Sequence, residues 1–449
     1  MKDTVKKNKI QLSDHFTYVR LLRFVIPSIG MMVFTSVYGV VDGLFVSNIV
    51  GKTAFAAINL IMPVEMIVGG IGFMIGTGGA ALVAKTLGEQ RQERAEQYFY
   101  MMISSTAIVG IIICIFIYIF MEPICIALGA NSDMINDCVT YGRISMYFNV
   151  FFMLQNSFQD FLIAAEKPHL GLLCTVFAGL SNIVLDALLI YVFHMGVAGA
   201  AYATGISEFI GAMIPLVYFI RPNSSLLNLK RCKPELRPIA KACGNGVSEM
   251  VTSITSSFVS MFYNVQLLKY IGSDGVAAYG VLMYVQFIFA AIFIGYAMGC
   301  SPVIGYHYGA RNTNELGNIL SKSFKLLFIT GTVMLAIGEF LAKPLSSFFV
   351  GYDTSLLILT VHAMRITTLC FIIVGINIFA SSFFTALNNG WVSAIISLLR
   401  TFVFKLSFVI LLPILIGIEG IWWSNTLSEI AAFIISMITL ALMCKRYDY

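Results

Sequence analysis

Charged residues are scarce in this chain: only 11% of its 449 residues carry a charge, whereas 58% are hydrophobic. Soluble domains usually carry about twice that fraction of charge. No water-soluble fold could cover so much apolar surface, so the composition excludes a large soluble all-α protein and predicts an all-α integral membrane protein. A cleavable signal peptide is not expected, because residues 1–23 are polar and basic and the apolar run after them is too long for its core.

Reactive and metal-binding patterns are also missing. The nine cysteines form no C-x-x-C pair and most lie inside apolar runs, so we expect neither a disulfide framework nor a metal site in them. None of the five histidines is paired with an acid at helical spacing in mid-span, which argues against an integral-membrane enzyme. We therefore expect no catalysis and no cofactor. The basic residues lie mostly in loops, so the net charge of +5 reports topology and no nucleic-acid partner is expected.

Long apolar runs are what the chain has in abundance. A membrane-spanning helix needs about 20 apolar residues. The runs predict twelve spans: 24–47, 54–84, 97–120, 137–163, 169–192, 197–220, 239–267, 275–305, 320–342, 358–386, 392–416 and 420–443.

The loops between these spans differ sharply in basic residues. Lys and Arg total 21 on one side and 3 on the other, which predicts that both termini are cytoplasmic. The predicted organisation is a cytoplasmic segment 1–23, an N-lobe 24–220 with spans 1–6, a linker 221–238, a C-lobe 239–443 with spans 7–12, and a cytoplasmic C-terminus 444–449.

The two halves are copies of one unit about 221 residues apart. At that offset Gly88 falls on Gly309 and Glu208 falls on Glu429. With six spans in each half, both copies start on the same side of the membrane, so the repeats are parallel. Such repeats are typical of transporters that rock two bundles about a central cleft, where substrate binds.

Acidic residues deep in spans are expensive and are functional by default. Asp42 lies 19 residues past Arg23, and Asp186 lies 19 residues past Lys167, on helices that both start inside. With a rise of about 1.5 Å per residue, the two carboxylates should reach the same depth in the outer half of the bilayer. Asn182 precedes Asp186 by one turn and shares its face.

Thr204, on a helix that descends from outside, reaches a similar level. Two carboxylates, an amide and a hydroxyl in a low-dielectric pocket suit a proton, because close carboxylates hinder each other's ionisation. The same oxygen ligands suit a dehydrated Na⁺. We therefore predict a cation-coupling site of Asp42, Asn182, Asp186 and Thr204, and no other metal site.

The second copy lacks these acids. Asp42 falls on Tyr263, and Asp186 falls on Ser407 or Phe408. A purely structural role, such as capping a broken helix, would more readily have survived in both copies. The asymmetry therefore favours an ion-binding role for the first copy.

Other deep charged residues fit structural roles better. Glu208 and Glu429 are present in both copies, as are Arg143 and Arg365, and we interpret them as packing or gating pairs. Lys405 comes out at a depth comparable to Glu429, so we expect a buried pair. Anion binding by Lys405 is the alternative.

Three segments resemble the multidrug and toxic compound extrusion (MATE) transporters. These are Val41-Asp42-Gly43 in span 1, Ser181-Asn182-Ile183-Val184-Leu185-Asp186 in span 5, and Gly196-Val197-Ala198-Gly199-Ala200-Ala201-Tyr202-Ala203-Thr204 leading into span 6. The resemblance covers essentially the whole chain. It implies a V-shaped fold of two pseudo-symmetric six-helix lobes and antiport of amphipathic drugs against H⁺ or Na⁺.

The resemblance is to the bacterial, DinF-like branch of that family, which has its cation site in the N-lobe. The matching positions here are Tyr38, Asp42, Gln159, Asn182, Asp186 and Thr204. The NorM-like branch instead uses acidic residues of spans 7 and 10, and span 10 (358–386) contains no Asp or Glu.

The sequence thus predicts a monomeric secondary transporter in the lipid bilayer that exports amphipathic, often cationic compounds in exchange for H⁺, with Na⁺ as the alternative ion. The candidate substrate-binding residues are Tyr38, Gln159, Glu65, Tyr263 and Gln286. A flippase for lipid-linked oligosaccharides of the same superfamily is the alternative function. It should show a cluster of basic residues in the central cavity, where the chain offers only Arg400 and Lys405.

Overall fold

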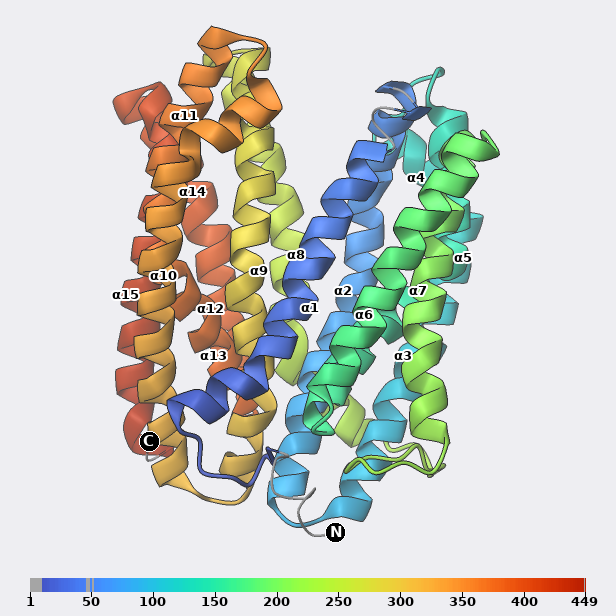
Figure 1. The fold of residues 1–449 in the computed structure, drawn as a ribbon, viewed down its shortest axis with the longest axis vertical. Helices are drawn as coiled ribbons and strands as arrows, with labels where there is room; N and C mark the ends of the chain where they lie inside the picture. The colour runs from blue at the N-terminus through green and yellow to red at the C-terminus, as the bar shows by residue number, and fades with distance from the viewer. Residues whose placement is uncertain (1–9, 46–48, 51, 448) are drawn as a thin grey trace.

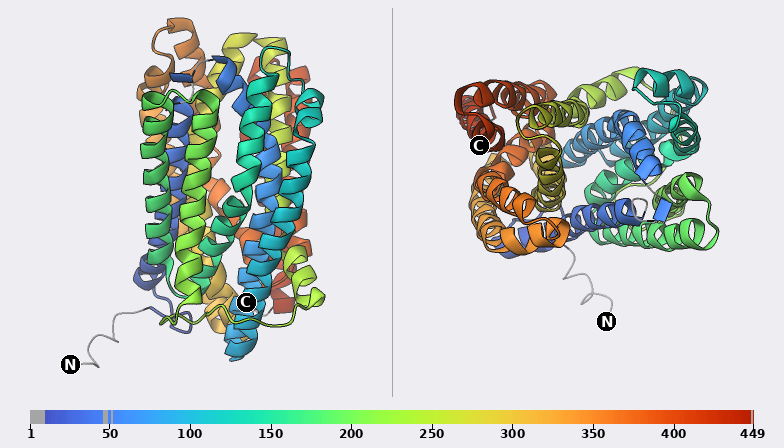
Figure 2. Two further views of the ribbon diagram at one scale, coloured as in Figure 1. Left: turned by 90° about the vertical axis from the view of Figure 1, so that its right-hand side faces the viewer. Right: turned by 90° about the horizontal axis from the view of Figure 1, so that it is seen from above.

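The helices form two lobes that stand side by side and diverge toward one end, which gives the molecule a V shape (Figure 1). The computed structural model describes residues 10–45, 49–50, 52–447 and 449. Over these residues the regular elements are all helical. Seen from above, the N-terminal and C-terminal groups of helices lie next to each other (Figure 2). The predicted fold class, all-α with two lobes, is confirmed.

Each lobe is a bundle of long helices, and in each lobe one of these helices is broken by a short turn and another contains a short π-helical turn. The N-lobe contains α1 (Tyr18–Phe45), α2 (Lys52–Gly88), α3 (Gln92–Ile119), α4 (Met121–Ala127), α5 (Ile135–Ala164), α6 (Pro168–Asp186), the π-helical turn η3 (Ala187–Val192) and α7 (Gly196–Ile220). The C-lobe contains α8 (Leu236–Tyr270), α9 (Ser273–Gly309), α10 (Thr313–Val350), α11 (Thr354–Thr368), α12 (Phe371–Ala386), α13 (Gly390–Leu398), the π-helical turn η4 (Leu399–Phe404), α14 (Lys405–Ile416) and α15 (Ile418–Tyr447).

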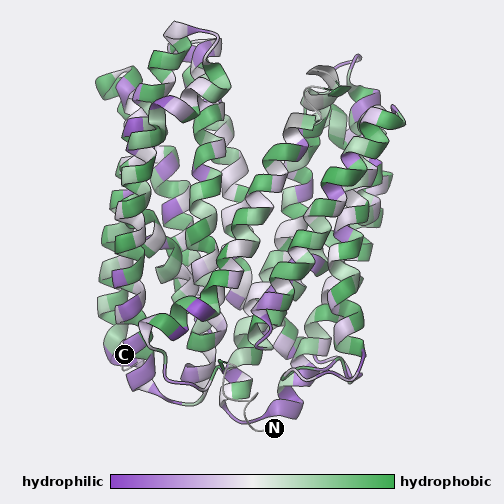
Figure 3. Cartoon of the chain, viewed as in Figure 1, coloured by the Kyte–Doolittle hydropathy of each residue, from purple (hydrophilic) through white to green (hydrophobic). Residues whose placement is uncertain are grey.

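Nine helices in the described part of the chain are long and apolar enough to cross a membrane, and the bent pair α11–α12 makes a tenth. The two remaining long helices, α5 and α8, complete twelve spans, but their polar side chains lower their hydropathy. Those of α5 are buried, as in Asn149, Asn156 and Asp160, where neighbouring helices shield them from lipid. Along both lobes the helices are mostly hydrophobic, and hydrophilic residues gather at the end that holds the C-terminus (Figure 3).

The lobes meet near that same end through glycines. A Cβ atom on Gly88 of α2 would clash with the carbonyl oxygen of Tyr306 on α9, and one on Gly309 would clash with that of Lys85 on α2. Gly299 on α9 lies less closely against α1, where an added Cβ would meet the Val25 side chain at 3.0 Å. Glycine permits this close approach because it has no side chain. The end that holds the C-terminus, which the loop charges predict to be cytoplasmic, is therefore the closed end.

Helix boundaries cross the predicted limits of the terminal segments, lobes and linker at three places. The first helix already begins at Tyr18, within the segment 1–23 expected to precede it. The first helix of the C-lobe begins at Leu236, inside the predicted linker 221–238. This early start is possible because Pro238 falls in the first turn, where the missing N–H of proline has no helical partner to lose. The α15 helix likewise runs on to Tyr447, past the predicted end of the C-lobe at 443.

The predicted span 358–386 is broken. Its halves, α11 and α12, meet at an angle of 50°. At the bend, side-chain hydroxyl groups form hydrogen bonds with backbone carbonyls. Thr367 Oγ1 donates to the carbonyl of Ala363 at 2.9 Å, and Thr426 Oγ1 of α15 donates to the carbonyl of Ile366 at 2.9 Å. Side chains that replace lost backbone partners allow a helix to bend inside a membrane.

Candidate functional site

The carboxyl groups of Asp42 on α1 and Asp186 at the end of α6 are adjacent. Asp186 is completely buried, and neither of its carboxyl oxygens has a hydrogen-bond partner among the described residues. Asp42 Oδ1 is likewise buried without a partner in that part of the chain. Two buried carboxyl groups that face each other without donors cannot both hold a negative charge at low cost. The arrangement can therefore bind a proton or a small cation.

The two other predicted members of this site lie on α6 and α7. Asn182 is one turn before Asp186, is 1% exposed, and has a buried amide oxygen without a hydrogen-bond partner in the described structure. An oxygen in that state is a further ligand for a cation. Thr204 is half-buried on α7, and its carbonyl accepts a hydrogen bond from Ser207 Oγ at 2.7 Å. The structure thus joins Asp42 to Asp186 directly and places Asn182 beside Asp186 on its helix.

Two more acids extend this pair into what we call the N-lobe carboxylate cluster: Asp42, Glu65, Asp186 and Glu208. Glu65 on α2 and Glu208 on α7 are close enough to interact electrostatically with each other and with Asp42. Within the described residues, no member of the cluster forms an ion pair with a lysine or arginine. Four helices therefore each bring one uncompensated carboxyl group to the same region.

Tyr38, a predicted substrate residue, borders this cluster. Its ring packs against Gly179 of α6, where an added Cβ would lie 2.8 Å from the ring. Its phenol lies within electrostatic range of Asp42 and Glu208. Tyr38 is therefore positioned to shield the carboxyl groups of α1 and α7.

In the C-lobe the buried acid Glu429 is instead paired with basic side chains. Arg400 Nε donates to both oxygens of Glu429, at 3.1 and 2.9 Å, and Asn377 Nδ2 donates to Glu429 Oε2 at 2.8 Å. Lys405 Nζ lies 3.6 Å from Glu429 Oε1. The predicted burial of Lys405 with Glu429 is confirmed, although Arg400 is the closer partner. Buried charges are usually paired in this way because an isolated one is costly.

Glu429 has the structural pairing role predicted for it, with Arg400 and Lys405 as its partners, whereas Glu208 forms no ion pair among the described residues. In the C-lobe Arg365 lies 3.8 Å from Glu339 and leaves Glu429 to other cations. In the N-lobe the Arg143 guanidinium lies over the ring of Tyr118, 5.7 Å from its centroid. Residues at equivalent positions of the two repeats therefore have different interaction partners, because the side chains around them differ.

A cavity of about 260 Å³, the central cavity, lies between the lobes. Helices of both lobes line it, including α2, α5, α8, α9 and α12. Its charged lining residues are Asp160 and Glu249 on one hand and Arg400 and Lys405 on the other. Thr77 Oγ1 donates to Asp160 Oδ2 at 2.9 Å. The cavity can therefore offer both signs of charge to a bound molecule.

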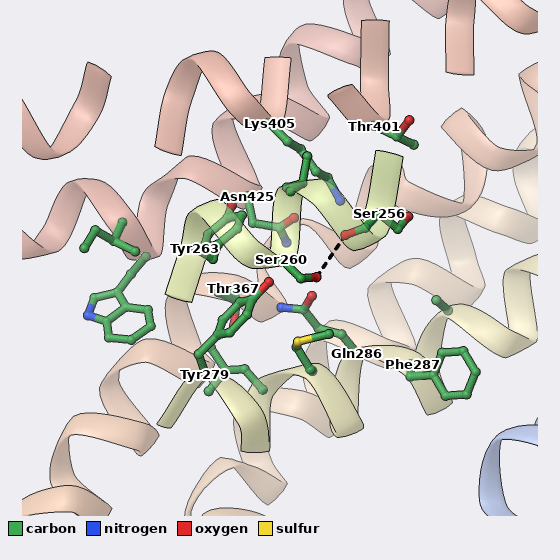
Figure 4. A pocket seen from close by; sticks show the side chains of 16 residues that line it. Ser256, Ser260, Tyr263, Tyr279, Gln286, Phe287, Thr367, Thr401, Lys405 and Asn425 are labelled. Carbon is green, nitrogen blue, oxygen red and sulfur yellow. Dashed lines mark hydrogen bonds between the residues drawn. The ribbon is translucent and has the colours of Figure 1, made fainter. Parts of the chain in front are cut away.

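A second cavity of about 230 Å³, the C-lobe pocket, adjoins the first (Figure 4). Both are lined by Ser256, Ala290, Thr401 and Lys405. In the C-lobe pocket the rings of Tyr263 and Tyr279 are stacked, with centroids 4.9 Å apart and planes 8° apart. Such stacked rings provide a flat apolar wall for an aromatic ligand.

The five predicted substrate residues fall into three places. Glu65 belongs to the N-lobe carboxylate cluster and Tyr38 borders it, Gln159 lines the central cavity, and Tyr263 and Gln286 line the C-lobe pocket. Gln159 Nε2 donates to Thr175 Oγ1 at 3.1 Å, so its amide is already partly satisfied. The two cavities share lining residues, whereas neither includes Tyr38 or Glu65 in its lining.

The described residues contain no group of three or more His, Cys, Asp or Glu side chains placed to hold a metal ion. All nine cysteines are free. The oxygen ligands that could hold a monovalent cation are those of Asp42, Asp186 and Asn182, because they are buried and lack donors.

Sequence reasoning did not assign Glu208 to the cation site, and it missed the exposure of Asp160 and Glu249 to the central cavity. One signal could have identified Glu208: Arg143 is the only basic residue inside the predicted N-lobe spans, so most of the acids there must remain without a cation.

Two lobes of six spans, with polar cavities where they meet and buried charges inside, define a polytopic membrane transporter of small molecules. The family model described as MatE matches the chain twice, over residues 27–188 and 250–411. The chain therefore belongs to the MatE family of transporters, and the predicted resemblance and internal repeat are confirmed.

Similar curated proteins cover nearly the whole chain. The multidrug export protein MepA of Staphylococcus haemolyticus is 24% identical over 428 residues, which cover 94% of this chain and 93% of that protein. MepA of Staphylococcus aureus is 23% identical over 440 residues, covering 95% of this chain and 94% of that protein.

Solved structures show the same fold. A MATE transporter in complex with MaL6 superposes with a TM-score of 0.93 at 20% identity, covering 98% of this chain and 99% of that one. A multidrug resistance MATE family transporter in an outward-facing conformation superposes with a TM-score of 0.90 at 21% identity, with coverages of 98% and 99%.

Proposed function

We propose that this protein is a secondary active exporter of amphipathic, often cationic compounds, driven by exchange for H⁺, with Na⁺ as the alternative ion. The observation that carries this proposal is the adjacency of Asp42 and Asp186, buried and without a cationic partner in the described structure. The MepA relatives are multidrug export proteins, which supports this class of cargo.

Ion binding would act by changing the charge of the N-lobe. A proton or Na⁺ that enters from the open side neutralises the Asp42–Asp186 pair and removes the penalty of buried charge. Span 1 can then bend near Pro27 or Gly39, and the affinity for substrate falls. A cycle of alternating access requires only that ion and substrate favour different states. This assigns coupling to the N-lobe, as in the DinF-like branch, and not to the C-lobe.

The flippase alternative receives less support. A flippase of this kind is expected to have several unpaired basic side chains in the central cavity. The basic residues there, Arg400 and Lys405, are both paired with Glu429. The proposed setting is the bacterial inner membrane with both termini in the cytoplasm, as a monomer without a cofactor.

Dye efflux from everted vesicles tests the proposal. An imposed pH gradient should drive transport of a cationic dye, and an imposed Na⁺ gradient should not. Asp42→Asn should abolish the driven component, while a Glu122→Gln variant at an exposed position should transport like the parent. Transport driven by Na⁺ alone would overturn the choice of proton. Parent-level efflux by Asp42→Asn would overturn the site.

A further inference from the structure

We propose that the C-lobe pocket is an anion-binding site that holds the carboxylate of an aromatic substrate on Lys405. The inference rests on the proposed export function and deepens it, since it adds aromatic carboxylates to a set of substrates otherwise expected to be cationic. It is carried by the charge balance around Lys405, by the polar groups that converge there, and by the size of the pocket.

Within the ion-paired group of Arg400, Lys405 and Glu429 the charge balance is positive, and Glu249 lies on the side of the central cavity. Glu429 is 2% exposed and serves two cations, and Arg400 and Asn377 already donate to its oxygens at 2.8 to 3.1 Å. The Lys405 ammonium stands 3.6 Å from that carboxylate. Charge-assisted hydrogen bonds are about 2.7–2.9 Å long, so Lys405 is attracted to Glu429 without donating a close bond to it. The positive charge of Lys405 and its N–H donors therefore remain available to a bound anion.

Lys405 is the one charged residue among the described residues that line the C-lobe pocket. No acid lines this pocket, so an anion that enters it meets the ammonium group and neutral donors, while Glu429, 3.6 Å from Lys405, lies outside the lining. A cation would gain nothing from this lining and would be repelled by Lys405. The pocket therefore selects negative charge.

Neutral hydrogen-bonding groups surround the ammonium. In Figure 4 the polar ends of four labelled side chains point toward one space, namely those of Lys405, Ser260, Gln286 and Asn425. The amide N–H₂ groups of Gln286 and Asn425 can donate to a carboxylate, whereas Ser260 Oγ already donates to the Ser256 carbonyl at 3.0 Å. A carboxylate has room for about four such bonds, so an ammonium with several neutral donors is a suitable set for it.

The remaining wall is aromatic. Tyr263 is fixed by a 2.7 Å hydrogen bond between its hydroxyl and Ser424 Oγ, and it stacks on Tyr279. Trp422 and Phe287 also line the pocket. An aromatic ring attached to the carboxylate would lie against these side chains.

The size of the pocket indicates how much of the molecule it takes. Ligand pockets for drug-sized compounds measure about 300–1,000 Å³, whereas this one measures about 230 Å³. It can therefore hold one end of a substrate, while the rest extends past Ser256 and Thr401 into the central cavity. There Asp160 can face a cationic group at the other end.

A matched pair of dyes tests the proposal. The probes are a xanthene dye with a free carboxylate and the methyl ester of the same dye, and binding to the full-length protein in nanodiscs is measured by fluorescence anisotropy without any ion gradient. Lys405→Gln should weaken binding of the carboxylate dye about tenfold or more, as expected for loss of a charge-assisted contact, and change binding of the ester by less than about twofold. Lys405→Arg should retain the preference of the parent for the carboxylate dye.

Two controls keep the result decisive. Thermal unfolding reports whether Lys405→Gln is folded, since Glu429 keeps Arg400 as a partner. If that variant does not fold, Gln286→Leu decides, and it should also weaken the carboxylate dye more than the ester. Equal losses for the two dyes, or no loss for either, would overturn the anion site. Because binding is measured without a gradient, this failure is distinct from failure of ion-driven export in vesicles.

Discussion

Gly88 of α2 and Gly309 of α9 occupy equivalent places in the two halves of the chain, and each lies against the backbone of the other helix. The contact is reciprocal: Gly88 meets Tyr306 and Gly309 meets Lys85. Such a pseudo-symmetric seam closes the two lobes at one end with backbone against backbone. In the proposed cycle of alternating access this seam has to open.

Gly88→Ala should therefore prevent this seam from closing. The added methyl group meets the backbone of Tyr306, which cannot move aside as a flexible side chain could. We expect loss of export and a shift away from the state in which the lobes diverge. Spin labels would be attached to cysteines placed at Tyr191 and Phe348, exposed positions on the two lobes, in a variant from which native cysteines have been removed. The shift would appear as a shorter distance between the two labels.

The control for this variant is Gly280→Ala. Gly280 lies on α9 as Gly309 does, but a Cβ atom there would meet nothing within 4 Å. This variant should keep the distance distribution and export of the parent. A Gly88→Ala protein with unchanged label distances would contradict the role of the seam.

Glu315 anchors the chain that precedes α1, and its replacement by alanine should destabilise the protein. Its carboxylate accepts from the Phe16 backbone N–H at 2.8 Å and contacts His15 Nδ1 at 2.6 Å. Leaving a buried donor unpaired costs about 1–3 kcal/mol, and thermal unfolding of purified protein would show a lower Tm. The exposed His362–Glu419 pair is a matched control, and Glu419→Ala should change stability by less than about 1 kcal/mol. Equal Tm values for the two variants would refute the anchoring role.

Glu429→Ala should be the most destabilising of the acidic substitutions in the C-lobe. It would leave Arg400 and Lys405 buried without a counter-charge, and breaking a buried ion pair costs about 3–5 kcal/mol. Glu339→Ala, which removes the half-exposed partner of Arg365, should cost about 0–1 kcal/mol. The comparison is made by thermal unfolding, and similar losses for both would show that the buried centre is less coupled than its geometry indicates.

The meeting of Asp42 with Asp186 could be predicted because both residues lie the same distance along helices that start on the same side. Distance along the axis sets depth, and depth survives errors of a few residues in helix boundaries. The twelve spans and two lobes could be predicted for a similar reason, since long apolar runs and the repeat fix them together.

Partners around the helix axis could not be predicted in this way. Glu208 and Glu429 share a register in the repeats, yet one joins the carboxylate cluster and the other pairs with Arg400. Which partner each glutamate has depends on the rotation of its helix about the axis and on side chains of other helices. The spacing of residues in the sequence predicts neither. The bend between α11 and α12 was missed because it depends on hydroxyl groups such as that of Thr426, distant in the sequence.

The account depends most on the claim that Asp42 and Asp186 together store the coupling ion. Proton release on substrate binding tests it most directly, in weakly buffered solution with purified protein and a pH-sensitive dye. If H⁺ is the ion, adding a cationic substrate to the parent should release protons, and Asp42→Asn and Asp186→Asn should each abolish the release while a folded state persists by thermal unfolding. Proton release equal to that of the parent in both variants would contradict the account.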